Sequence, residues 1–194
     1  ISGVEWDAVE LPSQFMENWC WQREGLDMFA AHYETGEKIP DELFEKIKAA
    51  QHFQSAMTMV RQLEFSLFDL RIHMDTSIET PEQIQQVLNE TRKQVSVVPA
   101  PESNRFQNGF THIFAGGYAA GYYSYKWAEV LSADAFARFE EEGLFSPQVG
   151  KDFLSHVLQQ GGSRPAMESF VAFRGREPSV EALLRHNGLQ ENAA

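Results

Sequence analysis

The feature that most constrains the fold of this chain is a helical repeat of apolar residues between positions 40 and 75. An apolar side chain recurs every three or four positions, at Leu43, Phe44, Ile47, Ala50, Phe53, Met57, Val60, Leu63, Leu67 and Leu70. This spacing follows the period of an α-helix, about 3.6 residues, and differs from the two-residue alternation of a strand. Pro40 suits a first helical turn, and the length of the repeat predicts a break near Gln51.

Helix start and stop signals divide much of the remaining sequence in the same way. Thr80 is a good N-cap, Pro81 suits the first helical position and Gln83 completes a capping box, so a helix is predicted from there to about Val95. Two prolines, an asparagine and a glycine mark residues 97–109 as a loop. A long helix is predicted over residues 117–141. Further helices are expected to begin at Ser146, Ser163 and Ser179, with glycines 143 and 188 as stops.

Strand signals are weak by comparison. Only residues 3–9 and 94–98 show short stretches that could form strands, and we find no internal repeat and no low-complexity segment. The sequence therefore predicts an all-α fold. Its 194 residues are enough for one domain with a substantial core, or at most two small domains.

Composition excludes several classes of partner. No apolar run approaches the roughly 20 residues that span a bilayer. The net charge of −12 repels nucleic acid and anionic lipid, so we expect neither nucleic acid nor membrane as a partner. The single cysteine, Cys20, allows no internal disulfide, which fits a reducing compartment and predicts a cytoplasmic location. Its apolar neighbours predict that Cys20 is a small buried side chain.

Residues 112–127, HIFAGGYAAGYYSYKW, contain four tyrosines, three glycines and a histidine. On the predicted helix, Tyr118, Tyr122 and Tyr125 share one face. A half-buried aromatic seam against another helix would explain them. The alternative is a row of neutral hydrogen-bond donors, which can stabilise an oxyanion, beside a mobile glycine loop.

A second candidate site is the acidic stretch at the beginning of the chain. Glu10 stands just before Pro12, where a helix is expected to start, and Asp7 and Glu17 flank it. A carboxylate at a helix start is commonly a cap or a partner of the helix dipole. The alternative is a metal ligand, since carboxylates bind Zn²⁺ when imidazoles complete the shell. The six histidines form no H-E-x-x-H or H-x-x-x-H pair, so the chain does not encode a complete zinc site.

Two long stretches, VELPSQFMENW and HIFAGGYAAGYYSYKWAEV, resemble the C-terminal part of the thimet oligopeptidase family of zinc metallopeptidases. The resemblance extends over essentially the whole chain and includes HYETGE, RQLEFSLFDLR, RFEEEGLF and FRGREP. It implies a larger α-helical peptidase that cuts short peptides. Residues 1–194 would then form the C-terminal part of its catalytic domain, and the chain would begin within a longer protein.

The resemblance also implies roles for single residues. In this family one zinc ion is held by both histidines of an H-E-x-x-H helix and by a later glutamate, which corresponds to Glu10. The H-E-x-x-H helix is absent from this chain and would lie upstream of Ile1. Tyr122, Tyr125 and His112 are implied to act on the scissile bond. Tyr118 and the flexible glycines 116 and 117 are implied to bind substrate.

Two functions therefore remain open. The chain is expected to be the C-terminal fragment of a zinc metallo-endopeptidase, supplying one zinc ligand and a substrate-facing wall of tyrosines to the remainder of the peptidase chain. Alone, it is then expected to be inactive and to retain no zinc, because one carboxylate is an incomplete site. The alternative is a non-catalytic helical module that binds peptides or a partner protein.

Overall fold

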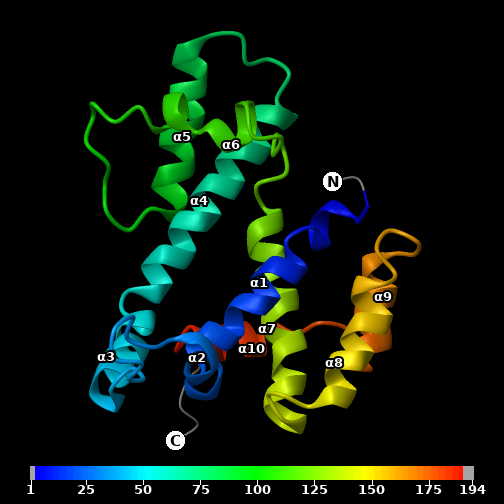
Figure 1. Cartoon of the computed structure of the whole chain (residues 1–194). Helices are drawn as coiled ribbons and strands as arrows, with labels where there is room; N and C mark the ends of the chain where they lie inside the picture. The colour runs from blue at the N-terminus through cyan, green and yellow to red at the C-terminus, as the bar shows by residue number, and fades with distance from the viewer. Residues whose placement is uncertain (1–2, 190–194) are drawn as a thin grey trace, which may run out of the picture. The chain divides into compact units, whose positions relative to one another are not determined.

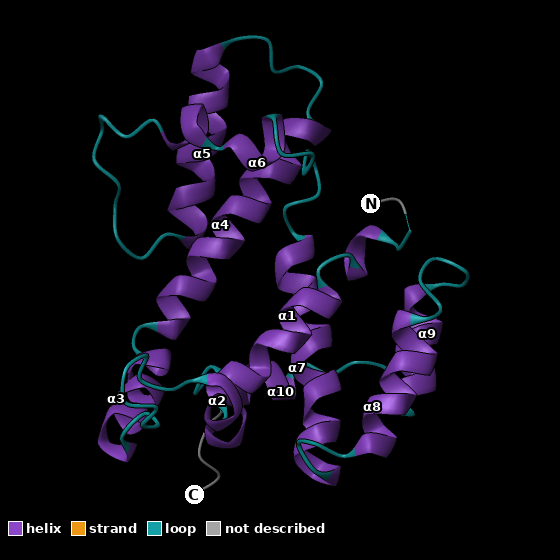
Figure 2. Ribbon diagram, viewed as in Figure 1, coloured by secondary structure: helices purple, strands orange, loops and turns teal. Residues whose placement is uncertain are grey.

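The fold is all-α, as the sequence predicts (Figures 1 and 2). A computed structural model describes residues 3–189. Its α-helices are α1 (Leu11–Glu17), α2 (Arg23–Phe29), α3 (Asp41–His52), α4 (Ser55–Met74), α5 (Pro81–Val95), α6 (Thr111–Phe114), α7 (Ser124–Glu142), α8 (Pro147–Phe153), α9 (Ala166–Arg174) and α10 (Glu181–His186). Short 3₁₀-helices cover Trp6–Ala8, Asn18–Trp21 and Phe106–Gly109, and a π-helical turn covers Leu154–Leu158.

The two short strands expected at residues 3–9 and 94–98 do not form. The first stretch contains a 3₁₀-helix, and the second lies at the end of α5 and in the turn after it. Within residues 3–189, β pairing is limited to an isolated bridge between Ala31 and Lys38. No described helix is both long enough and apolar enough to cross a membrane.

The long apolar repeat forms two helices instead of one. The break between α3 and α4 falls at Phe53 and Gln54, close to the predicted position, and Gln54 takes a positive φ of 55°. Part of the repeat does not enter a core, since Leu43 and Phe53 are exposed. The period of the sequence therefore predicts the helices correctly, but it does not predict which of their apolar residues are buried.

The predicted helix starts at Thr80 and Ser146 are confirmed, whereas α10 has Val180 and not Ser179 as its N-cap. Thr80 caps α5 with a complete capping box, and the Ser146 hydroxyl accepts a hydrogen bond from the backbone N–H of Val149 at the start of α8. Ser163 does not cap α9, whose N-cap is Pro165. Cys20 is exposed, so the prediction that it is buried is wrong.

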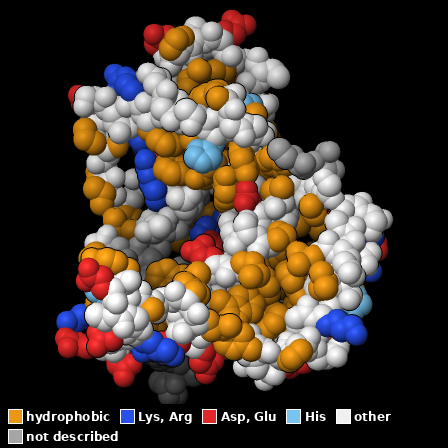
Figure 3. Space-filling view, viewed as in Figure 1, with side chains coloured by type: hydrophobic (Ala, Val, Ile, Leu, Met, Phe, Trp, Pro, Cys, Tyr) orange, Lys and Arg blue, Asp and Glu red, His pale blue; other side chains and the backbone are white. Residues whose placement is uncertain are grey.

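The chain divides into two compact units. The first unit comprises residues 1–55 and 127–194, and the second comprises residues 56–126. The core of the first unit is rich in aromatic rings from α1, α7, α8 and α9, among them Phe15, Phe136, Phe139, Phe153, Phe170 and Phe173. The rings of Phe15 and Phe153 stack at 4.0 Å. Large apolar side chains of this unit are also exposed, among them Met16 of α1 and Leu154 of the π-helical turn. Figure 3 shows hydrophobic side chains on the surface of one face.

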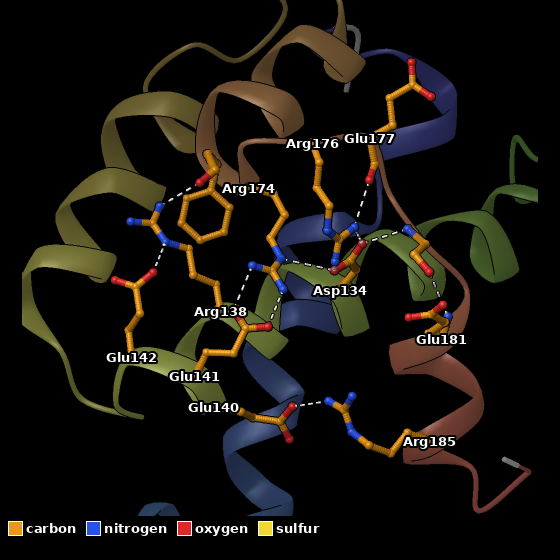
Figure 4. Close-up of polar contacts among 12 residues, drawn as sticks. Asp134, Arg138, Glu140, Glu141, Glu142, Arg174, Arg176, Glu177, Glu181 and Arg185 are labelled. Carbon is orange, nitrogen blue, oxygen red and sulfur yellow. Dashed lines mark hydrogen bonds and ion pairs between the residues drawn. The ribbon is translucent and has the colours of Figure 1, made fainter. Parts of the chain in front are cut away.

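A buried carboxylate anchors the segment after α9 to α7 in the first unit (Figure 4). Asp134 accepts hydrogen bonds from Arg174 at 3.1 Å, from two nitrogens of Arg176 at 2.6 Å, and from the backbone N–H of Ser179 at 2.7 Å. Burial raises the pKa of Asp134, but the hydrogen bonds from Arg176, Ser179 and Arg174 together hold it below the ordinary value of a carboxyl group. Asp134 is therefore a structural anion.

The second unit has its own core. Phe68 and Leu88 are fully buried, Phe110, Ile113 and Tyr122 are buried beside them, and the ring of Phe65 stacks on that of Phe106 at 4.5 Å. This core lies beneath α6 and the segment that joins α6 to α7. The joining segment carries most of the residues that the sequence singles out.

Candidate functional site

The predicted helix over residues 117–141 begins later than expected, at Ser124. Residues 115–123 form a series of turns between α6 and α7. Tyr118 and Tyr122 therefore do not lie on a helix with Tyr125, and the prediction that all three share one helical face is wrong. Gly117 and Gly121 are the local signal against a helix here, because glycine is unfavourable in a helix interior.

Backbone geometry explains why two glycines begin these turns, which we call the glycine turn (residues 115–123). Gly117 adopts a φ of 83°, a left-handed conformation that costs other residues strain. A β-carbon on Gly116 would lie 2.9 Å from both the Cα and the carbonyl oxygen of His112, too close for an ordinary contact. The backbone N–H of Tyr118 donates to that same carbonyl oxygen at 2.9 Å. The glycines thus fold the chain back onto His112.

The glycine turn gathers four of the predicted site residues into one aromatic cluster. The ring of His112 lies 6.1 Å from that of Tyr118, 5.6 Å from that of Tyr122 and 6.1 Å from that of Tyr125. The rings of Tyr118 and Tyr125 stack at 4.8 Å, and those of Tyr122 and Tyr125 are 5.2 Å apart. The structure therefore brings together the predicted site residues of the second unit, although by a turn and not by a helix.

The members of the cluster differ in exposure. Tyr122 is buried, and its hydroxyl donates a hydrogen bond to Oε1 of Gln62 at 2.9 Å. Burial raises the pKa of the Tyr122 phenol and the nearby Tyr125 adds to the rise, while Arg61 opposes it. His112 is exposed, and Tyr118 and Tyr125 are half-buried. The cluster thus combines a buried, neutral phenol with three rings that solvent reaches.

Two residues that support the cluster were missed by sequence reasoning. Gln62 accepts the hydrogen bond from Tyr122, and the fully buried carboxylate of Asp69 accepts backbone N–H bonds from the glycine turn. Both lie on α4. The signal that could have found Asp69 is its place in the run SLFDL, where an acidic residue interrupts apolar neighbours.

Glu10 belongs to the first unit, at the N-cap of α1. Its side chain makes no capping hydrogen bond to the helix backbone. The hydroxyl of Ser13 lies 3.0 Å from Oε2 of Glu10 and 3.0 Å from its carbonyl oxygen. Among residues 3–189, no group of three or more His, Cys, Asp or Glu side chains is arranged to hold a metal ion. As a donor, Glu10 fits one position of a three-ligand zinc site.

The chain is similar to known peptidases over almost its whole length. A family model described as "Peptidase family M3" matches residues 1–189. The chain is 56% identical over 190 residues to oligopeptidase A of Salmonella typhimurium, covering 98% of this chain and 28% of that protein. It is 51% identical over 193 residues to the organellar oligopeptidase A of Arabidopsis thaliana, covering 97% of this chain and 24% of that protein.

A more distant relative shows the same pattern of coverage. Saccharolysin of Saccharomyces cerevisiae is 35% identical over 189 residues, which cover 96% of this chain and 26% of that protein. The chain thus spans about 28% of the length of the bacterial relatives that it matches.

Proposed function

Because the chain belongs to peptidase family M3, we propose that it is the C-terminal part of the catalytic domain of a zinc metallo-endopeptidase that hydrolyses short peptides. The observation that carries this proposal is the cluster of His112, Tyr118, Tyr122 and Tyr125 around the glycine turn. Exposed and half-buried polar rings beside Gly116 and Gly117, which carry no side chains, form a surface that a peptide can approach closely. The names of the relatives support peptides as the substrate class.

Within this proposal Glu10 is one of three protein ligands of a single zinc ion. Catalytic zinc sites commonly combine two histidines with one glutamate and keep one position open. The two histidines would come from an H-E-x-x-H helix that this sequence does not contain. When bound, zinc polarises a carbonyl group and activates a water molecule.

The tyrosine cluster would supply hydrogen-bond donors, which a metal ion does not provide. Phenols with a pKa near or above about 10 stay protonated at neutral pH and can donate to an oxygen that gains negative charge. We assign this role first to Tyr125, whose ring is half-buried. Tyr122 can share it only by exchanging its hydrogen bond to Gln62 for one to substrate. His112, Tyr118 and the two glycines 116 and 117 would hold the peptide on either side of the reacting bond.

The proposal includes a cytoplasmic location and no nucleic-acid or membrane partner. It rests on the single cysteine, which leaves no internal disulfide to form in an oxidising compartment, and on the net charge of −12. Cell fractionation with an antibody against the complete protein tests the location. Recovery of the protein in a membrane fraction would contradict it.

The decisive experiment is a glutamate variant in the complete peptidase that carries these 194 residues. Glu10→Gln replaces a carboxylate with a neutral amide, a poorer zinc ligand, so zinc content after dialysis against a weak chelator should fall together with cleavage of a quenched fluorescent peptide. Glu17→Gln is the matched control, because Glu17 is an exposed residue at the other end of the same helix.

The outcomes separate the two candidate functions. Zinc retention that is equal in both variants would remove Glu10 from the metal site. Peptide binding without cleavage by a metal-loaded wild-type protein would favour the alternative, a helical peptide- or partner-binding module without catalysis.

A further inference from the structure

We propose that Asp69 is the positioning residue of the tyrosine cluster, acting through the backbone of the glycine turn. This inference rests on the proposed function, because it concerns how the cluster is held in place to meet a peptide. Asp69 lies on α4, far from the cluster in sequence, and is fully buried. Its carboxylate accepts hydrogen bonds from backbone N–H groups of the glycine turn, so its effect on a reaction would be indirect.

The contacts of Asp69 are directed at one short segment. Its Oδ1 accepts the backbone N–H of Ala120 at 2.9 Å, and its Oδ2 accepts the backbone N–H of Tyr122 at 2.9 Å. The carboxylate therefore binds the backbone on both sides of Gly121. One of the two bonds is made by the backbone of a cluster residue, and the other lies two residues after Tyr118.

These two hydrogen bonds explain the strained backbone conformation of Ala120. Ala120 adopts a φ of 54°, in the left-handed region that residues with a β-carbon rarely occupy. Such a conformation persists only where the surroundings impose it. The bond from the N–H of Ala120 to Asp69 is a charge-assisted hydrogen bond in a buried environment, where it is stronger than in water.

A third contact holds the carboxylate itself. The Nδ1 atom of His73, one helical turn further along α4, lies 2.9 Å from Oδ1 of Asp69 and 2.8 Å from its carbonyl oxygen. The rotation of the Asp69 side chain is thereby restricted from within its own helix. The helix α4 therefore holds the carboxylate of Asp69, and this carboxylate holds the backbone of the glycine turn. The backbone in turn positions the rings of Tyr118 and Tyr122.

The test is Asp69→Asn in the complete peptidase. Asparagine keeps the shape of the side chain but replaces one acceptor oxygen with an NH₂ group, so one of the two backbone N–H groups loses its acceptor. We expect amide hydrogen exchange to become faster in peptides that cover residues 115–125. We also expect kcat to fall about ten- to a hundredfold, since misplacement by about 1 Å is enough for such a loss.

Asp134→Asn is the matched control. Asp134 is an equally buried carboxylate that accepts a backbone N–H, but it does so in the first unit. Replacing Asp134 with asparagine should lower the melting temperature. It should not change amide hydrogen exchange over residues 115–125 and should cause no selective loss of kcat. If Asp69→Asn does not fold, His73→Ala replaces it, because releasing Oδ1 should raise exchange at Ala120.

Three possible results test whether Asp69 positions the glycine turn. Faster exchange confined to residues 115–125, with a fall in kcat that Asp134→Asn does not share, supports the proposal. Unchanged exchange in Asp69→Asn, or in His73→Ala if the first variant does not fold, overturns it. A wild-type protein that cleaves no peptide overturns the peptidase function, and the exchange data then still show whether Asp69 holds the glycine turn.

Discussion

Tyr122 and Tyr125 provide a matched pair that separates a chemical role from a structural one. Both lose only a hydroxyl group when replaced by phenylalanine, so the rings and their contacts remain. Tyr125 keeps its stack on Tyr118 at 4.8 Å, and Tyr122 keeps its place in the core of the second unit. Any difference between Tyr125→Phe and Tyr122→Phe therefore reports what the two hydroxyls do.

We expect the Tyr125 variant to lose catalytic rate and the Tyr122 variant to lose stability. Loss of one donor to a developing oxyanion typically lowers kcat by about 10²–10³, equivalent to about 2.7–4 kcal/mol of transition-state stabilisation, and we expect Tyr125→Phe to fall in this range with little change in KM. Tyr122→Phe removes the hydrogen bond to Gln62, which should cost about 0.5–1.5 kcal/mol of stability. Because Gln62 is half-buried, water can replace part of the lost bond, and we expect the lower half of that range.

The assay combines steady-state cleavage of a quenched fluorescent peptide with thermal melts of the complete peptidase and both variants. Tyr118→Phe is a third variant, expected mainly to raise KM because Tyr118 lies closer to the glycine turn's first residues. A Tyr125→Phe enzyme with normal kcat and a lowered melting temperature would refute the catalytic assignment. Equal kinetic losses in Tyr122→Phe and Tyr125→Phe would refute the distinction drawn from the Gln62 contact.

Two further predictions concern backbone and charge. Gly116→Ala places a β-carbon 2.9 Å from the backbone of His112, so this histidine must shift; we expect a higher KM in peptide cleavage, whereas Gly109→Ala, where a β-carbon would contact nothing within 4 Å, should leave KM unchanged. Asp134 has a lowered pKa in the folded state, so its contribution to stability is present above the unfolded pKa of about 3.9 and is lost as pH falls through the folded value. Melting temperatures of wild type and Asp134→Asn should therefore differ clearly at pH 7, begin to approach each other as pH falls below about 3.9, and converge only below the folded pKa of Asp134. A difference that does not shrink on acidification would contradict this.

Local signals in the sequence were sufficient for most of the helices. The capping box at Thr80 depends on atoms within four residues, and the apolar repeat of α3 and α4 depends on helical period alone. Such features are complete within a short stretch of chain, and for this reason they can be read without the fold. Residue types and spacing singled out the tyrosines and Glu10, whereas their roles came from resemblance to a family and remain predictions.

The geometry of the cluster was decided by tertiary structure. The spacing of the tyrosines predicts a helix through residues 117–123, but the carboxylate of Asp69 binds the N–H of Tyr122, 53 positions away, and offers that segment an alternative to helical hydrogen bonds. The same fold gives the hydroxyl of Tyr122 a partner in Gln62, 60 positions away. The sequence by itself determined an all-α chain and the residues worth examining. Which tyrosine is buried, and where α7 begins, depend on contacts between distant segments that exist only once α4 packs against the glycine turn.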